Sequence, residues 1–224
     1  MSDGLILALD TATRASIVVL GRDAPLATSR RDVQHRHGSH LLEQIDEVLE
    51  HAGRSLDEVE ALAVGTGPGS FTGLRVGLAT AKTVAYAREL PLVGVMSSDA
   101  LRLAGADAGA DPDAAVVLPA GAHDHYLARV GQDPVLVAPG DLAQALAGLT
   151  ALAVDTGPEP LGGGAADLGA AAVEGLPAAL LRLAVTRLVD GQTDDVAELT
   201  PAYVALPRGV KRAAEDLGWS PDLR

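Results

Sequence analysis

A glycine-rich block constrains the fold of this chain more than any other segment. Residues 65–73 read GTGPGSFTG and lie between a short apolar strand predicted at 61–64 and a helix predicted from about Thr72 to Arg88. Backbone N–H groups that end a strand and open a helix can hold an anion, although glycines in this setting also permit tight packing. The block has neither the Gly-Lys-Ser/Thr of a Walker loop nor the spacing of a dinucleotide fingerprint. Both interpretations, packing and anion contact, therefore stay open.

The order of the predicted elements indicates an α/β fold. Three strands joined by short turns come first, and helix, strand, helix and strand follow. Ser39 can cap the first helix and Gly53 can end it. The strands are expected at 5–10, 15–20, 26–30, 61–64 and 92–95, and the helices at about 39–52 and 72–88. This is the order of a ribonuclease-H-like half, and two such halves build the actin and sugar-kinase superfamily.

The second half of the chain carries a weaker pattern. Its Ala/Gly/Asp-rich tracts at 104–114 and 162–175 are predicted to be loops. The strands are expected at 114–118, 126–130, 135–137 and 151–154, and the helices at 141–149 and 178–189. We divide the chain into an N-terminal lobe at 1–103, a smaller C-terminal lobe at 104–206 and a polar tail at 207–224, which we expect to be mobile.

Charge and composition exclude several classes of function. The formal net charge is −13 and aromatic residues make up only 2%, so the chain lacks the basic surface and the stacking platforms of a protein that binds RNA alone. Cysteine is absent, which excludes disulfides, thiolate metal sites and cysteine nucleophiles. There is no signal-peptide pattern and no run of roughly 18 apolar residues. A soluble cytoplasmic protein without a membrane segment is therefore expected.

The helix predicted at 72–88 is apolar nearly all round. A stripe of small residues recurs every four positions, at Gly73, Gly77, Ala81 and Ala85. Larger apolar side chains cover most of the remaining surface, namely Leu74, Val76, Leu78, Val84 and Ala87. From Phe71 to Arg88, the only charged residues are Arg75, Lys82 and Arg88. Such a helix should be buried on more than one side, either wholly within the chain or partly against another subunit.

Candidate catalytic and metal-binding groups are few. Asp10 ends the first strand, where it can either contact a ligand or stabilise the turn that follows. A nuclease of this fold needs several carboxylates for two metal ions, but Gly65 and Thr66 end the strand after the first helix. Five of the six histidines fall into two groups, His35, His37 and His40 and then His123 and His125, and neither group has a zinc spacing. No metal site is predicted.

Three sequence blocks resemble the TsaB (YeaZ) family. They are LALDTAT at 7–13, AVGTGPGSFTGLRVG at 63–77 and LPLVGV at 90–95, and the central block is long and specific. The likeness is strong over 5–103 and returns at 201–204. The resemblance implies an actin-like ATPase fold of two ribonuclease-H-like lobes, the second reduced. It also implies a non-catalytic paralogue of TsaD, the subunit that transfers threonylcarbamoyl to tRNA.

The resemblance further implies a scaffold and activator role. Such a subunit binds and stabilises TsaD in the complex that forms N6-threonylcarbamoyladenosine next to the anticodon of tRNAs reading A-starting codons. A TsaE-type ATPase joins the complex, ATP and metal belong to these partners, and tRNA is contacted only through the complex. In isolation a homodimer is expected. The helices at 39–52 and 72–88 would form the contact, with interface residues Leu41, Leu42, Ile45, Leu49, Gly73, Val76, Gly77, Thr80, Ala81 and Val84.

A comparison with the TsaD motif bears on catalysis. TsaD proteins carry Asn-His-x-x-Gly-His after a Val-Gly-Val strand, and both histidines bind the metal. When the motif is aligned on 93–95, Ser97 and Leu101 replace them, and leucine cannot donate to a metal, so no catalytic residue is assigned. The alternative is an independent ATPase or glycoprotease-like metallohydrolase. Its nucleotide or anion loop would use Asp10, Gly67, Gly69, Ser70, Thr72, Gly73 and Arg75.

Overall fold

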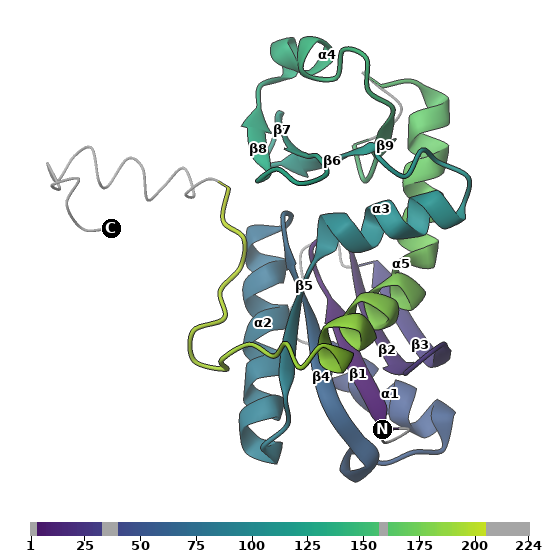
Figure 1. Ribbon diagram of the computed structural model, residues 1–224, viewed down its shortest axis with the longest axis vertical. Coiled ribbons are helices and arrows are strands. Elements are labelled where there is room, and N and C mark those ends of the chain that lie inside the picture. The colour runs from purple at the N-terminus through teal and green to yellow at the C-terminus, as the bar shows by residue number, and fades with distance from the viewer. Residues whose placement is uncertain (1–3, 33–39, 157–160, 205–224) are drawn as a thin grey trace, which may run out of the picture.

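The computed structural model describes residues 4–32, 40–156 and 161–204, which form two lobes, each built on its own β-sheet (Figure 1). The expected cap at Ser39, the histidines His35 and His37 and the tail at 207–224 lie outside the described residues. The first sheet has five strands and the second has four. This arrangement confirms the α/β, actin-like fold class with a smaller second lobe.

The first sheet has the predicted order of a ribonuclease-H-like half. Its strands are β1 (Leu5–Asp10), β2 (Ala15–Gly21), β3 (Pro25–Asp32), β4 (Val59–Gly67) and β5 (Leu92–Met96), in the spatial order β3-β2-β1-β4-β5. The first three pair antiparallel, whereas β4 lies parallel to both β1 and β5. β1 and β2 are buried on both faces and read as continuous apolar runs, while the edge strand β3 is largely exposed.

Helices cover both faces of this sheet. One core cluster joins side chains from one face of β1 and β2 to α1 (Leu41–Ala52) and α2 (Phe71–Arg88). The other cluster joins the opposite face to α3 (Ser97–Asp107) and α5 (Gly163–Val189). A short 3-10 helix, η1 (Leu56–Glu58), leads into β4. The predicted end of α1 is confirmed, because Gly53 adopts the left-handed conformation at φ 62° and its N–H donates to the Glu50 carbonyl oxygen.

The second lobe is a four-stranded sheet with one small helix on its outer face. Its strands are β6 (Ala115–Ala120), β7 (Asp124–Ala128), β8 (Val135–Val137) and β9 (Ala151–Ala153), in the order β8-β7-β6-β9. η2 (Pro139–Asp141) and α4 (Leu142–Ala145) replace the longer helix predicted at 141–149. Leu142 and Leu146 bury themselves against Val117 and Leu127 of the sheet, so this short helix still closes the lobe.

The tract at 162–175 is helical, and its prediction as a loop was wrong. α5 begins at Gly163 and runs for 27 residues from the second lobe to the first sheet (Figure 1). The glycines that obscured the pattern permit close approach: a Cβ on Gly169 would clash with the Ala153 backbone, and one on Gly175 would lie 3.0 Å from Ala104 Cβ. The tract at 104–114 is also partly helical, because α3 continues to Asp107, and the boundary proposed at 103 falls inside this helix.

α5 has the length and composition of a membrane-spanning helix, over Gly164–Val189. Its apolar side chains nevertheless belong to the core cluster shared by the two lobes, among them Ala172, Leu176, Leu180 and Ala184. A helix buried between two sheets has this composition for the same reason that a membrane helix does, since neither meets water on its apolar sides. We therefore interpret α5 as a core helix.

The stripe of small residues on α2 packs against the chain's own β1–β2 turn. Gly73, Gly77, Ala81 and Ala85 are all buried. The Thr11 hydroxyl donates to the Gly73 carbonyl oxygen at 2.7 Å. A Cβ added to Gly73 would clash with the Thr11 backbone, and one added to Gly77 would clash with the Thr11 hydroxyl. The stripe is therefore buried within the chain, whereas the opposite side of α2 is exposed, so burial of that side against another subunit stays a prediction.

The segment 192–204 runs along the free edge of β5 and along the side of α2 that carries Lys82 (Figure 1, yellow). The N–H of Asp194 donates to the Leu92 carbonyl oxygen at 2.8 Å, and the Gly94 N–H donates to the Asp194 carboxylate at 2.6 Å. Lys82 Nζ donates to the carbonyl oxygens of Ala197 and Leu199. An edge strand is thereby closed to further pairing.

The glycine contact on Thr11 makes a prediction about stability. We expect Gly77→Ala to lower the free energy of unfolding by about 1–3 kcal/mol, because the added methyl group overpacks a site without free volume. The matched control is Gly164→Ala in α5, where no atom lies within 4 Å of an added Cβ and where alanine favours a helix. Equilibrium urea unfolding measures both. Equal midpoints for Gly77→Ala and the unmodified chain would contradict the packing role.

Candidate functional site

The glycine block and the β1–β2 turn form one compact unit at the carboxyl ends of β1 and β4. The Ser70 N–H donates to the Ala12 carbonyl oxygen at 2.8 Å. Gly69 lies so close to Ala12 that an added Cβ would clash with its backbone. The Ser70 side chain accepts a hydrogen bond from the Gly73 N–H at 3.1 Å and so caps α2. The loop therefore rests directly on the turn.

Asp10 lies beneath this unit and is fully buried. Its Oδ2 accepts a hydrogen bond from the Ser97 hydroxyl at 2.6 Å, and its Oδ1 accepts one from the Ala12 N–H at 2.9 Å. Burial raises the pKa of Asp10 above its ordinary value of 3.8, although the hydrogen bonds from Ser97 and Ala12 act in the opposite direction. Because both carboxyl oxygens are engaged, Asp10 stabilises the turn in this structure.

The residues of the candidate anion loop are brought together, but three of their backbone donors are used internally. The Gly67 N–H donates to Ser97 Oγ at 3.1 Å, and the Ser70 and Gly73 N–H groups also have partners within the chain. Thr72 and Arg75 alone in this set present exposed side chains. Packing thus accounts for the glycines, while an anion contact of this loop stays a prediction.

The positions aligned with metal ligands do not fit a metal ion. Ser97 and Leu101 are both fully buried, with Ser97 bonded to Asp10 and Leu101 in the core shared by the lobes. Within residues 4–32, 40–156 and 161–204, no group of three or more His, Cys, Asp or Glu side chains could share an ion. His40 contacts Glu43 on α1, whereas His125 lies in the sheet of the second lobe.

Only part of the predicted partner interface is accessible. The chain's own core buries Leu41, Ile45, Leu49, Gly73, Gly77 and Ala81. Val76, Thr80 and Val84 are half-buried, and the Leu42 side chain on α1 is 62% exposed. A partner can therefore reach the last four of these ten residues, and the interface itself stays a prediction.

A buried polar group that the sequence did not reveal fixes α1 on the sheet. Gln44 lies on the apolar face of the helix and is fully buried. Its Oε1 accepts from the Ser16 hydroxyl at 2.5 Å, and its Nε2 donates to Ser29 Oγ at 3.2 Å. Every polar atom of this amide has a partner, so the group sets the position of α1 without an unsatisfied donor. Helical spacing alone had suggested only an apolar contact there.

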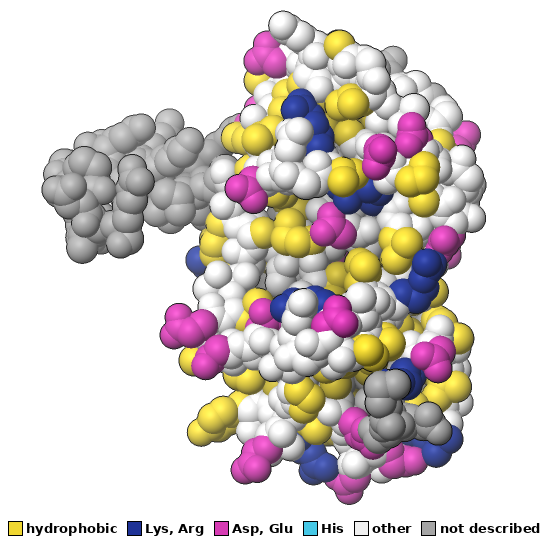
Figure 2. Space-filling view, in the orientation of Figure 1, with side chains coloured by type: hydrophobic (Ala, Val, Ile, Leu, Met, Phe, Trp, Pro, Cys, Tyr) yellow, Lys and Arg dark blue, Asp and Glu magenta, His cyan; other side chains and the backbone are white. Residues whose placement is uncertain are grey.

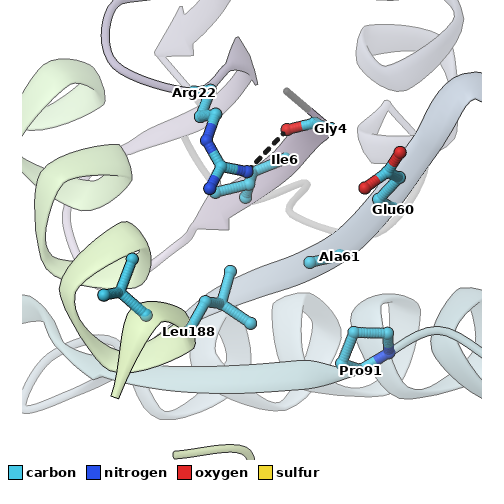
Figure 3. Close-up of a pocket in the computed structure, with 8 residues that line it drawn as sticks. Gly4, Ile6, Arg22, Glu60, Ala61, Pro91 and Leu188 are labelled. Atoms are coloured by element: carbon cyan, nitrogen blue, oxygen red, sulfur yellow. Dashed lines mark hydrogen bonds between the residues drawn. The ribbon is translucent and has the colours of Figure 1, made fainter. Parts of the chain in front are cut away.

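The cavity in Figure 3 lies at the opposite end of the first sheet. It encloses about 290 Å³ between the start of β1, the start of β4 and the end of α5. Arg22 reaches over it and donates to the Gly4 carbonyl oxygen at 3.1 Å. Ligands of open α/β sheets bind outside the carboxyl ends of the strands, which here is the glycine-block end. We therefore assign no function to this cavity.

The surface supports no independent nucleic-acid site on the face that Figure 2 shows. Among the described residues of that face, Lys and Arg side chains are interspersed with Asp and Glu. A protein that holds a phosphate backbone by itself concentrates its cations in one patch.

Comparisons with known proteins agree with the geometry. The family described as "TsaD: tRNA N6-adenosine threonylcarbamoyltransferase" matches residues 30–196, more than half of the chain. The "tRNA threonylcarbamoyladenosine biosynthesis protein TsaB" of Escherichia coli K12 is 41% identical over 90 residues, which are 40% of this chain and 39% of that protein. The Haemophilus influenzae protein of the same name is 33% identical over 135 residues, 60% of this chain and 57% of that protein. The chain thus matches less than two thirds of either relative.

Solved structures show the same fold. A Pseudomonas aeruginosa protein described as similar to peptidase YEAZ superposes with a TM-score of 0.67 and 24% identity, over 90% of this chain and 100% of its own. A second structure, YeaZ from Pseudomonas aeruginosa, gives a TM-score of 0.65 over 89% of this chain and 99% of its own. At this identity the likeness concerns the fold alone. With the matched family and the curated relatives, it leads to one conclusion: the chain belongs to the TsaB (YeaZ) family, the paralogues of the TsaD transferases.

Proposed function

We propose that this chain is a non-catalytic subunit that binds and stabilises a TsaD-type transferase during the formation of N6-threonylcarbamoyladenosine on tRNA. The relatives named for threonylcarbamoyladenosine biosynthesis support the pathway. The observation that carries the subunit role is an exposed row of residues on α2, which we call the outer stripe. It consists of Thr72, Arg75, Ala79, Thr83 and Tyr86.

The outer stripe has the composition of a docking surface. Its residues recur at intervals of three and four, so they line one side of the helix opposite to the buried glycines. Ala79 and Thr83 are small enough for another helix to approach, and Tyr86 exposes 80% of its surface at one end. Tyrosine and arginine dominate binding energy at protein interfaces. Leu42 on α1, which lies on the same face of the sheet as α2, is a further exposed apolar side chain.

The chemistry is assigned to the partners. Ser97 and Leu101 offer no ligand set, and both oxygens of Asp10 already accept hydrogen bonds, which supports a role without metal or ATP of its own. A TsaE-type ATPase completes the proposed complex. The net charge of −13 favours contact with tRNA only through that complex. We further propose that the isolated chain forms a homodimer through the same surface and that it is located in the cytoplasm.

Reconstitution tests this function directly. Cognate TsaD-type and TsaE-type subunits, ATP, threonylcarbamoyl adenylate and tRNA are combined with and without this chain, and the modified nucleoside is measured by liquid chromatography and mass spectrometry. We expect modification to require the chain. Ala79→Arg should abolish assembly by placing a long charged side chain in the stripe, whereas the same change at the exposed Ala143 of α4 should not. Equal modification without the chain would refute the proposal.

The buried carboxyl group gives a prediction about pH. Because the folded state raises the pKa of Asp10 by burial, this group favours folding most at low pH, below its ordinary value of 3.8. That contribution is lost as the pH rises through the folded pKa. Asn cannot ionise, so the stability of Asp10→Asn relative to the unmodified chain should increase between pH 4 and pH 7. Urea unfolding at several pH values measures this difference, and a difference independent of pH would contradict it. If the chain is a non-catalytic subunit, Asp10→Asn should still assemble with the TsaD-type subunit. An independent enzyme that depended on Asp10 would instead lose its activity.

A further inference from the structure

Arg75 is held in one place by the few aromatic rings of this chain. Its guanidinium carbon lies 4.0 Å from the centroid of the Phe71 ring and 5.8 Å from that of Tyr203. Its Nε donates to the Tyr203 hydroxyl at 3.0 Å. The two rings are 5.5 Å apart and tilted by 41°. Phe71 is the single phenylalanine of the sequence, so this pairing of rings and arginine brings together scarce aromatic residues from α2 and from the segment that follows α5.

The terminal amino groups of Arg75 nevertheless remain available. Within the described residues neither Nη1 nor Nη2 has a hydrogen-bond or ion-pair partner. Most other arginines do donate to oxygens of this chain, namely Arg22, Arg30, Arg31, Arg54, Arg88, Arg102, Arg129, Arg182 and Arg187. The guanidinium of Arg14 also lacks a partner in the described part of the chain, but no ring holds it. Among the described arginines, Arg75 alone is both stacked on aromatic rings and without a partner at its two terminal nitrogens.

We propose that the Arg75 guanidinium binds a carboxylate side chain of the partner protein and is the polar anchor of the outer stripe. This inference rests on the proposed function and names the contact that it requires. A guanidinium presents parallel N–H donors that match a carboxylate. Stacking on Phe71 and the hydrogen bond to Tyr203 fix that fork before binding, so less conformational entropy is lost when the pair forms.

The surroundings favour one carboxylate over a polyanion. The other two cations of α2 are already engaged, since Lys82 donates to Ala197 and Leu199 and Arg88 pairs with Asp57. Arg75 is therefore the cation of α2 whose terminal amino groups stay free, and one cation on this helix cannot by itself supply the several phosphate contacts that give nucleic acids their affinity. It can pair with one acidic residue beside the small side chains of the stripe. The partner surface is therefore expected to place an Asp or Glu opposite the first turns of α2.

Three substitutions test separately the charge of Arg75, the parallel donors of its guanidinium and the hydrogen bond from it to Tyr203. Arg75→Met keeps the stem against Phe71 and removes the fork, Arg75→Lys keeps the charge without parallel donors, and Tyr203→Phe keeps the ring without the hydroxyl. The control is Arg14→Met, the unpaired arginine outside the stripe. Calorimetry with the purified cognate TsaD-type subunit gives each Kd. We expect at least about a tenfold weakening for Arg75→Met, smaller losses for Arg75→Lys and Tyr203→Phe, and a change below about twofold for Arg14→Met.

The outcomes distinguish this inference from the function on which it rests. If the unmodified chain does not bind the subunit, the proposed function and the inference fail together. If Arg75→Met binds as tightly as the unmodified chain, the inference alone fails. If Arg75→Met instead loses tRNA binding in a filter assay while it still binds the subunit, the ligand of Arg75 is a phosphate group and not a carboxylate, and the inference fails. Urea midpoints equal to that of the unmodified chain show that the variants are folded. A loss of binding is then caused by the loss of the Arg75 guanidinium and not by unfolding.

Discussion

The contact between Thr11 and the first turns of α2 is the constraint on which the first lobe depends. The helix can approach the β1–β2 turn only because Gly73 and Gly77 have no side chains there, and the Thr11 hydroxyl then closes the contact on the Gly73 carbonyl oxygen. The same approach sets the loop on Ala12 through Gly69 and Ser70. The position of α2, and with it the direction of the outer stripe, follows from this junction.

The first lobe was predictable because its elements carry distinct periods. β1 and β2 are continuous apolar runs, and α1 repeats its buried residues every three or four positions. The second half of the chain was harder to predict from sequence. Alanine and glycine fill the first turns of α5, so its two sides differ little in hydrophobicity and no helical period can be recognised. The close approach of Gly169 to Ala153, which explains those glycines, joins residues that local sequence does not connect.

The sequence located the candidate site but not how its residues are used. The glycine block was evident, whereas its role depends on partners far along the chain. Ser97 meets Asp10 across 87 residues, and Tyr203 meets Arg75 across 128. Gln44 was hidden for a related reason, because a polar residue on an apolar helical face becomes meaningful only when Ser16 and Ser29 are opposite it. The family resemblance also implied an interface at Gly77 and Ala81, although both residues are buried within the chain.

The two sides of the glycine block now have separate roles. On the inner side, Ser97 donates to Asp10 and accepts from Gly67, so the end of the first sheet is bound together as core. A carboxylate that is fully buried and hydrogen-bonded has little capacity left for a ligand, so a partner is expected on the outer side. There the residues are exposed and Arg75 is already fixed by two rings. Packing within the chain thus fixes Arg75 on the exposed side of α2, where a partner can reach it, and the proposed recognition depends on that packing.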